Sequence, residues 1–292
     1  MKFGAIDIGT NAVRLLIGEV VKEENTAYVK KVSYTRIPLR LGMDVFSNSI
    51  ISDQKKEDFI DAMQAFSHVA KMFKVKALRA CATSAMREAA NADEVISAVE
   101  AATGIRIEVI SGDEEARLIF GTFFLLRIDK SSPFVVVDVG GGSTEINVFE
   151  KGNRVACKSF EIGTIRMLKN KTKPNVWKEI QKWIAQNIDP KHRHTVYATG
   201  GNINKINKMI GKDKEGVRVE KLSELHQKLK TLSVKEREDQ YKLNPDRADV
   251  IVPACQIFEF IFREMKTNKV LVPKIGLSDG IVYDLYLQHQ EG

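Results

Sequence analysis

Residues 134–152 read FVVVDVGGGSTEINVFEKG, and residues 3–20 read FGAIDIGTNAVRLLIGEV, so the chain uses one pattern twice. Each copy is a β-branched strand that ends in Asp-hydrophobic-Gly, followed by a small polar turn and a second strand of alternating character. The turns contain Gly, Thr, Ser and Asn, which let backbone N–H groups converge on an anion without obstruction by side chains. Asp7 and Asp138 occupy the same place in the two copies. The repeat predicts two similar domains, each with its own anion-binding turn.

The rest of the chain alternates strands and helices, which predicts an α/β fold. With 292 residues and 43% hydrophobic content, the chain is long enough for two domains with separate cores. The segment RIDKSSP (127–133) precedes the second copy and is the expected boundary. We therefore expect an N-terminal lobe over 1–127 and a C-terminal lobe over 128–292, whose last helix could pack back on the first lobe.

Further segments predict strand-turn-helix units. Residues 76–91 read as a strand, a turn through Thr83 and a helix, and residues 194–210 read as a strand, a Thr-Gly-Gly turn and a helix. Residues 243–265 form a long helical pattern that contains Pro253. Because proline lacks the N–H that a helix interior needs, Pro253 either kinks this helix or marks its true start.

Composition and charge favour a globular protein with an anionic partner. No apolar run approaches membrane-spanning length, and the N-terminus enters a strand pattern without a leader, so we expect a cytoplasmic protein with no membrane partner. The net charge of +7 favours a nucleotide, a nucleic acid or a phosphate polymer, but charge alone does not choose among them. Cys81, Cys157 and Cys255 lack C-x-x-C spacing, and we expect reduced core thiols.

Residues 111–118 read SGDEEARL and place three acids at the expected start of a helix. Ser111 follows a strand-like run and is the natural N-cap, and Glu114 completes an S-x-x-E capping box. A negative charge at Asp113 is favoured by the helix dipole. Glu115 has no such role at the helix end. Taken alone, however, this stretch favours the simpler interpretation that all three acids lie at a helix N-terminus without a catalytic role.

Three small-residue turns follow strands: DIGTN (7–11), DVGGGST (138–144) and ATGG (198–201). One such turn is weak evidence, because turns between strands need glycine anyway. Two such turns that begin with aspartate in duplicate domains, and a third turn in the second domain, are much more specific evidence for a binding site. They indicate phosphate binding by backbone N–H groups, with a carboxylate that holds a divalent cation.

These motifs resemble the actin, sugar-kinase and heat-shock-ATPase superfamily, and within it the exopolyphosphatase and guanosine pentaphosphate phosphatase family. The resemblance spans almost the whole chain through AIDIGTNAVRL, CATSAMREA, IEVISGDEEARLIF, VVDVGGGSTE, FEIGT, YATGGN and IGLSDG, in the family's order. It implies two duplicated ribonuclease H-like lobes with a phosphate-binding cleft between them. It also implies a homodimer and no nucleic-acid partner.

The resemblance assigns roles to individual residues. Glu115 matches the family's general base, and Arg87 matches an arginine that faces the cleft; an exposed helix arginine is the alternative for Arg87. Asp138 and Glu145 would hold Mg²⁺ or another divalent cation, and activation by K⁺ is open. The matched phosphate-binding positions are Asp7, Thr10, Asn11 and Arg14 in the first lobe and Gly140, Gly141, Gly142, Ser143 and Thr144 in the second, with Thr83, Gly200 and Gly201 as weaker candidates. Asp7 could instead be an ordinary turn aspartate.

The expected activity is Mg²⁺-dependent release of terminal orthophosphate from inorganic polyphosphate, with Glu115 as base. Guanosine pentaphosphate is the alternative substrate, and a phosphotransferase or ATPase, or a phosphate sensor without catalysis, is more distant. Two departures from the family leave the substrate preference open: Ala12 lacks a hydroxyl, and Ser278 stands where many relatives have a basic residue. Longer relatives continue into a helical domain that this sequence lacks, so we expect lower processivity on very long polymer.

Overall fold

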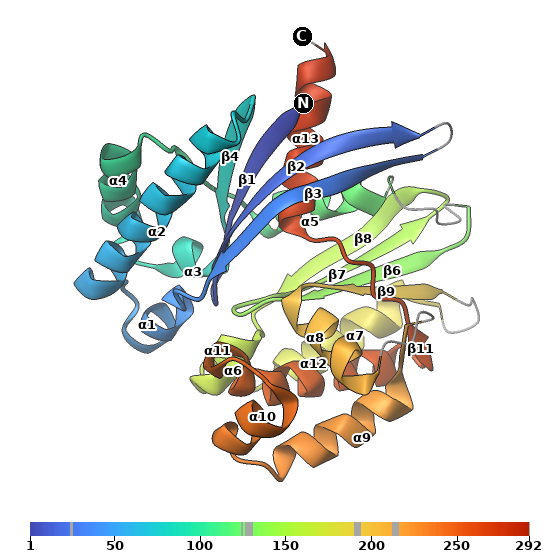
Figure 1. The fold of residues 1–292 in the computed structure, drawn as a ribbon. Coiled ribbons are helices and arrows are strands. Elements are labelled where there is room, and N and C mark those ends of the chain that lie inside the picture. The colour runs from blue at the N-terminus through green and yellow to red at the C-terminus, as the bar shows by residue number, and fades with distance from the viewer. Residues whose placement is uncertain (24–25, 124, 126–130, 190–193, 212–215, 292) are drawn as a thin grey trace. The chain divides into compact units, whose positions relative to one another are not determined.

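The computed structural model describes residues 1–23, 26–123, 125, 131–189, 194–211 and 216–291 (Figure 1). The chain forms two compact units, Met1–Ile128 with Ile275–Gly292, and Asp129–Lys274, which we call the first and the second unit. The C-terminal segment therefore groups with the first unit. The boundary expected at residues 127–128 lies outside the described residues.

The sheet of the first unit has the strand order β3-β2-β1-β4-β5. Its strands are β1 Lys2–Ile8, β2 Val13–Glu23, β3 Thr26–Ile37, β4 Ala77–Ala82 and β5 Ile107–Val109. β1 is antiparallel to β2 and parallel to β4. Residues 3–8 of β1 are buried without alternation, which is typical of a central strand covered on both faces.

The sheet of the second unit repeats this plan with the order β8-β7-β6-β9. Its strands are β6 Phe134–Val139, β7 Thr144–Glu150, β8 Asn153–Phe160 and β9 Thr195–Thr199. β6 is antiparallel to β7 and parallel to β9, and a parallel bridge from Tyr197 to Leu271 stands where β5 stands in the first unit. β10 Val217–Arg218 and β11 Lys269–Val270 form a separate pair. The duplicated α/β fold predicted from the two Asp-hydrophobic-Gly turns is confirmed.

Helices complete each unit. In the first unit, α2 and α4 lie on one side of the sheet and α5 and α13 on the other (Figure 1). The bounds in this unit are α1 Leu41–Asn48, α2 Asp53–Met72, α3 Ser84–Glu88, α4 Ala92–Thr103, α5 Gly112–Phe123 and α13 Leu277–Glu291. Those in the second unit are α6 Thr164–Leu168, α7 Val176–Asn187, α8 Gly201–Ile210, α9 Val219–Lys230, α10 Val234–Tyr241, α11 Pro245–Ala248 and α12 Ile251–Glu264. Within the described ranges, no helix is both long and apolar enough to cross a membrane.

Two sequence-based expectations are refined by the fold. Residues 243–265 form α11 and α12 rather than one helix, and Pro253 lies in the first turn of α12, where a missing N–H costs no hydrogen bond. Cys81 and Cys255 are buried, but Cys157 is exposed, so the prediction of a core thiol there was wrong. The reason is that β8 is an edge strand whose residues are mostly exposed.

Helix α13 packs closely on α5 in the first unit. A Cβ at Gly280 would collide with the backbone carbonyl of Leu118 in α5, and one at Gly121 of α5 would contact the ring of Tyr283 at 3.6 Å. Glycine at position 280 thus brings the two helix backbones into contact. The GLSDG motif (276–280) therefore has a packing role that its composition did not reveal.

Candidate active site

The hairpin turn between β1 and β2 is braced by an ion pair. Asp7 and Arg14 are partners across the two strands, and Arg14 Nη1 lies 2.6 Å from Asp7 Oδ2. Within the turn, the Gly9 amide donates to the Ala12 carbonyl at 3.1 Å. Asp7 is only 7% exposed, so its charge is balanced locally by Arg14. This ion pair therefore fixes the guanidinium of Arg14 at the base of the turn.

The same turn is fastened to neighbouring segments through Thr10 and Asn11. The hydroxyls of Thr10 and Ser84 are hydrogen-bonded at 2.8 Å, and the carbonyls of Thr10 and Asn11 accept from the amides of Gly42 and Arg40. The Thr83 amide donates to the Ile8 carbonyl at 3.1 Å. These contacts fix the turn against the start of α3. The Thr10 hydroxyl is thus already engaged with Ser84.

Arg87 and Glu115 come together in the first unit, although they lie on different helices. Arg87 Nη1 donates to the carbonyl of Ile110 at 2.6 Å and lies 3.7 Å from Glu115 Oε2. Their side chains are 25% and 16% exposed. Arg87 is therefore held in place by a backbone carbonyl, and the alternative of an exposed helix arginine does not describe it. A partly buried cation next to a partly buried carboxylate is suited to act on an anionic substrate.

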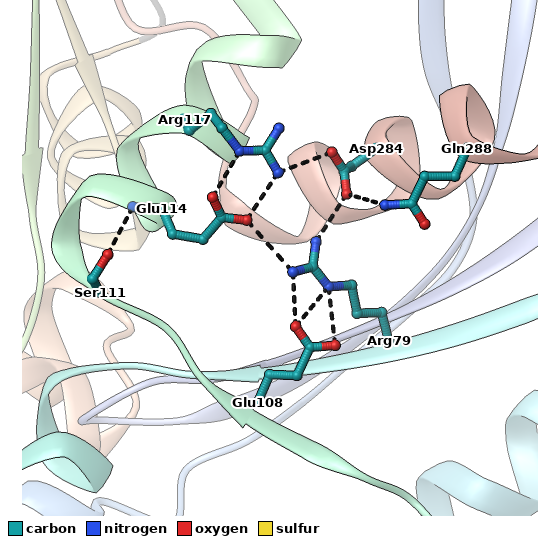
Figure 2. A network of polar contacts seen from close by, with 7 residues as sticks. All are labelled: Arg79, Glu108, Ser111, Glu114, Arg117, Asp284 and Gln288. Carbon is teal, nitrogen blue, oxygen red and sulfur yellow. Dashed lines mark hydrogen bonds and ion pairs between the residues drawn. The ribbon is translucent and has the colours of Figure 1, made fainter. Parts of the chain in front are cut away.

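The neighbouring glutamate has different partners. The Ser111 hydroxyl accepts from the Glu114 amide at 3.1 Å, so the predicted N-cap is present. The Glu114 carboxylate turns to Arg117, with contacts of 2.7 and 2.8 Å, and to Arg79 at 3.5 Å (Figure 2). The reciprocal half of the capping box was therefore predicted wrongly. The hydrogen bonds from Arg117 hold the pKa of Glu114 below its ordinary value.

In the second unit, the glycine turn between β6 and β7 is anchored by α6. The Gly140 amide donates to the Ser143 carbonyl at 3.0 Å, and the amides of Thr164 and Ile165 donate to the carbonyls of Gly140 and Gly141. A Cβ at Gly163 would lie 2.5 Å from the backbone of Gly141 and Gly142. The glycine of FEIGT is therefore required for close backbone packing against the glycine turn.

Arg166 contacts this glycine turn, and the sequence motifs did not predict that contact. Its side chain is buried, and its Nε donates to the carbonyl of Gly142 at 2.7 Å. Thr144 also has a structural bond, from its hydroxyl to the Ile162 carbonyl at 2.7 Å. The signal for Arg166 was its place three residues after the FEIGT glycine, a spacing that returns the side chain to the turn once α6 is formed.

Asp138 and Glu145 face each other across β6 and β7, where they are directly paired. Glu145 is buried, and its Oε1 accepts a hydrogen bond from Ser159 at 2.7 Å. No group of three or more acidic, histidine or cysteine residues suited to a metal occurs in the described part of the chain. Mg²⁺ commonly takes one or two carboxylates and completes its octahedron with water and phosphate oxygens. The Asp138–Glu145 pair fits a cation of that kind.

The Thr-Gly-Gly turn lies next to this pair. Gly200 has φ +96, and a Cβ there would lie 2.6 Å from Asp138 Oδ1, so both backbone conformation and space require glycine. A Cβ at Gly201 would lie 2.6 Å from Nη2 of Arg247, whose Nη1 donates to Asn202 Oδ1 at 3.0 Å. Like Arg166, Arg247 is a basic residue beside a glycine turn that the sequence motifs did not indicate.

Basic side chains gather at α8, which follows the turn. Burial, together with the charges of Lys208 and Arg247, lowers the pKa of Lys205. The local potential beside Gly201 is therefore positive and favours an anion.

The two positions that depart from the family are both buried. Ala12 is fully buried between β1 and β2, and Ser278 is 5% exposed at the start of α13. Next to Ser278, Asp279 forms an ion pair with Lys31 at 3.0 Å and accepts from the Gly276 amide. Burial raises the pKa of Asp279. Both departures thus occur at positions that pack within the first unit.

The candidate residues fall into two groups, one in each unit. In the first unit, direct contacts join Asp7 with Arg14 and Arg87 with Glu115. In the second unit, strand pairing joins Asp138 with Glu145, and Gly200 lies against Asp138. The remaining candidates are Thr10, Asn11 and Thr83 in the first unit and Gly140, Gly141, Gly142, Ser143, Thr144 and Gly201 in the second.

The chain is similar to known proteins. The model of the Ppx/GppA phosphatase family matches residues 20–289. Exopolyphosphatase 2 of Mycobacterium tuberculosis is 27% identical over 316 residues, which cover 97% of this chain and 98% of that protein. A bifunctional 3-dehydroquinate synthase/phosphatase of Fusobacterium nucleatum is 35% identical over 170 residues, but that match covers 56% of this chain and only 25% of that protein. A crystal structure of an exopolyphosphatase from Cytophaga hutchinsonii, 22% identical, has the same fold, with a TM-score of 0.82 over 99% of this chain and 98% of that chain.

Proposed function

The chain belongs to the Ppx/GppA phosphatase family, and from this premise we propose that it releases terminal orthophosphate from inorganic polyphosphate in a Mg²⁺-dependent reaction with Glu115 as general base. The relative that spans nearly its whole length is named an exopolyphosphatase. The net charge of +7 suits a polyanionic substrate.

One observation carries the choice of Glu115: the two adjacent glutamates of α5 have different surroundings. Glu114 is bonded to Arg117 and Arg79 and has a lowered pKa, which makes it a poor proton acceptor. Glu115 lies 3.7 Å from Arg87 and is 16% exposed. A base must reach a water molecule next to the reacting phosphorus, and Glu115 has both access and a neighbouring cation that attracts the substrate.

The chemistry follows from these positions. A water oxygen attacks the terminal phosphorus, Glu115 accepts the water proton, and the bond from phosphorus to the bridging oxygen breaks with its electron pair on the departing chain. Arg87 donates to oxygens of the phosphoryl group, and its planar fork suits them. In the transition state negative charge is spread over those oxygens and grows on the departing bridging oxygen, so donors held in place beforehand accelerate the step.

The second unit contributes phosphate binding. Gly141 to Thr144 supply backbone N–H groups at a turn that the Gly140 amide, α6 and Arg166 hold in shape. Mg²⁺ held by Asp138 and Glu145 would neutralise phosphate charge. Gly200 and Gly201 let the next turn approach without side chains, beside the Arg247 guanidinium.

The substrate is tested by measuring orthophosphate release with Mg²⁺ from long polyphosphate, tripolyphosphate, guanosine pentaphosphate and ATP, presented separately at matched phosphate concentration. The proposal predicts the highest kcat/KM for polyphosphate. Preference for guanosine pentaphosphate would keep the catalytic residues and replace the substrate. Release from ATP only in the presence of an organic acceptor would instead indicate a phosphotransferase, and no release from any of them would contradict hydrolysis.

A further inference from the structure

Four side chains of the first unit form a closed ring of alternating charge (Figure 2). Glu114 contacts Arg117 at 2.7 and 2.8 Å and Arg79 at 3.5 Å. Asp284 closes the ring, because its two carboxylate oxygens contact Arg117 at 3.0 Å and Arg79 at 2.9 Å. We call these four residues the charge ring. Asp284 belongs to α13, so the ring ties the C-terminal helix to the start of α5.

The charge ring is anchored to the central sheet. Arg79 lies on β4, and Glu108 of the neighbouring strand β5 accepts from its guanidinium at 2.8 to 3.3 Å. Gln288, one turn after Asp284 on α13, donates to Asp284 at 2.9 Å. The side chains of Arg79 and Asp284 are 15% and 13% exposed, so solvent screens their contact less than it screens an ordinary surface pair.

Backbone packing joins the same two helices independently of charge. Gly280 of α13 lies against the carbonyl of Leu118, which is three residues after Glu115 on α5. Glu114 and Arg117, both members of the ring, lie on either side of Glu115 in the chain. The N-terminal half of α5 is therefore held by the charge ring at Glu114 and Arg117 and by the Gly280 contact at Leu118.

We propose that Asp284 is a positioning residue for Glu115: through the charge ring, the C-terminal helix fixes the turn of α5 that carries the catalytic base. This inference rests on the proposed role of Glu115 in hydrolysis. A base must be held close to its productive position, because misplacement by about 1 Å can cost on the order of a hundredfold in rate. Asp284 itself does not touch substrate. Its effect is exerted on the backbone between Glu114 and Arg117.

The test replaces Asp284 by Asn, which keeps the shape of the side chain and removes its charge. Orthophosphate release from long polyphosphate is expected to fall about tenfold in kcat at unchanged KM, since the geometry of the base changes and the phosphate-binding turns do not. Asp284→Glu, which restores a carboxylate, is expected to recover part of the rate. Gln290→Ala is the matched control: it alters an exposed residue of the same helix and is expected to leave kcat unchanged.

A second variant distinguishes a loss of catalytic rate from a loss of folding. Arg117 is the most exposed member of the ring, at 53%, so Arg117→Gln breaks the ring from the solvent side and is expected to reproduce the loss of kcat while the thermal unfolding midpoint stays within a few degrees. A ring that only stabilises the helix would lower that midpoint and leave kcat per folded molecule unchanged, which would overturn the proposal.

The decisive comparison combines Asp284→Asn with Glu115→Gln. If Asp284 acts through Glu115, adding Asp284→Asn to Glu115→Gln lowers the residual rate no further, because residues that act as a unit are not additive. Equal tenfold losses in both backgrounds would overturn the positioning role while the function of Glu115 stands. A Glu115→Gln variant with undiminished turnover would overturn the assignment of Glu115 as general base, and the positioning role with it.

Discussion

Asp138 and Glu145 lie directly opposite each other on the antiparallel strands β6 and β7, and Ser159 holds the Glu145 carboxylate from the adjacent strand β8. Two carboxylates on one face, beside a glycine turn, are the ligands that we propose for Mg²⁺, whose remaining ligands would be water and phosphate oxygens.

The first prediction concerns this pair. Asp138→Asn is expected to raise the Mg²⁺ concentration for half-maximal orthophosphate release at least about tenfold, because one anionic ligand is lost. Glu150→Gln is the control, since it removes an exposed carboxylate from the end of β7. The measurement is a Mg²⁺ titration of initial rates. Identical Mg²⁺ dependence in Asp138→Asn and the unmodified protein would exclude this site.

A second prediction follows from the contact between Gly163 and the glycine turn. In Gly163→Ala, the added methyl group would overlap the backbone of Gly141 and Gly142, so the turn must shift. We expect a cost of about 1–3 kcal/mol in the free energy of unfolding and weaker polyphosphate binding, measured by titration calorimetry. Gly276→Ala is the control, because nothing lies within 4 Å of a Cβ at Gly276. Unchanged binding in Gly163→Ala would show that this turn does not contact substrate.

The third prediction concerns acid stability of the second unit. The His226 Nδ1 lies 2.5 Å from the buried Glu259 carboxylate. Burial opposes ionisation of Glu259, but hydrogen bonds from His226 and Ser223 and the charge of Arg263 outweigh it, so the pKa of Glu259 lies below its ordinary value. A depressed carboxyl pKa contributes stability above the unfolded value of about 4.3, and that stability is lost as pH falls through the folded value.

We therefore expect the free energy of unfolding to drop more steeply in the unmodified protein than in Glu259→Gln as the pH falls below about 5, through the unfolded value of about 4.3 toward the lower folded value. Denaturant unfolding at several pH values measures this difference. Glu224→Gln, at an exposed position of α9, should keep the steep dependence. Parallel curves for Glu259→Gln and the unmodified protein would show that this pair contributes nothing to acid sensitivity.

The fourth prediction addresses the missing hydroxyl at position 12. Because Ala12 is fully buried, Ala12→Ser places a hydroxyl where it needs a buried partner. We expect the free energy of unfolding to fall by about 1–3 kcal/mol and kcat/KM for polyphosphate not to rise. A gain in kcat/KM without loss of stability would contradict this, and would mean that the serine hydroxyl reaches the substrate.

Local patterns in the sequence were sufficient to predict the duplicated fold. The turns after Asp7 and Asp138 specify similar hairpins, and Ser111 is the N-cap that its position indicated. The capping assignment of the Glu114 carboxylate failed because Arg117, three residues later on the same helix, is its nearest partner. The further contacts of this pair depend on tertiary structure. Arg79 is 35 residues from Glu114 in the chain, and Asp284 is 167 residues from Arg117.

The candidate site likewise contains residues that local sequence predicts and residues that it does not. Positions within one turn, such as Gly140 to Thr144, can be inferred from residue type. Arg247 has no local signature, and the spacing of Arg166 from the FEIGT glycine becomes informative only once α6 is known. Neither arginine could therefore be assigned to Gly142 or Gly201 from the sequence. The glycines at 163 and 280 likewise show their purpose only when another backbone lies against them.

The central claim is that Glu115 removes a proton from the attacking water. The most direct measurement is kcat for orthophosphate release from polyphosphate by Glu115→Gln, alongside the Kd for the same polymer, with Asp113→Asn as the control because it removes an exposed carboxylate from the same turn of α5. We predict a fall in kcat of about 10²–10⁴-fold with Kd nearly unchanged, and little effect of Asp113→Asn. Undiminished turnover in Glu115→Gln would contradict the account.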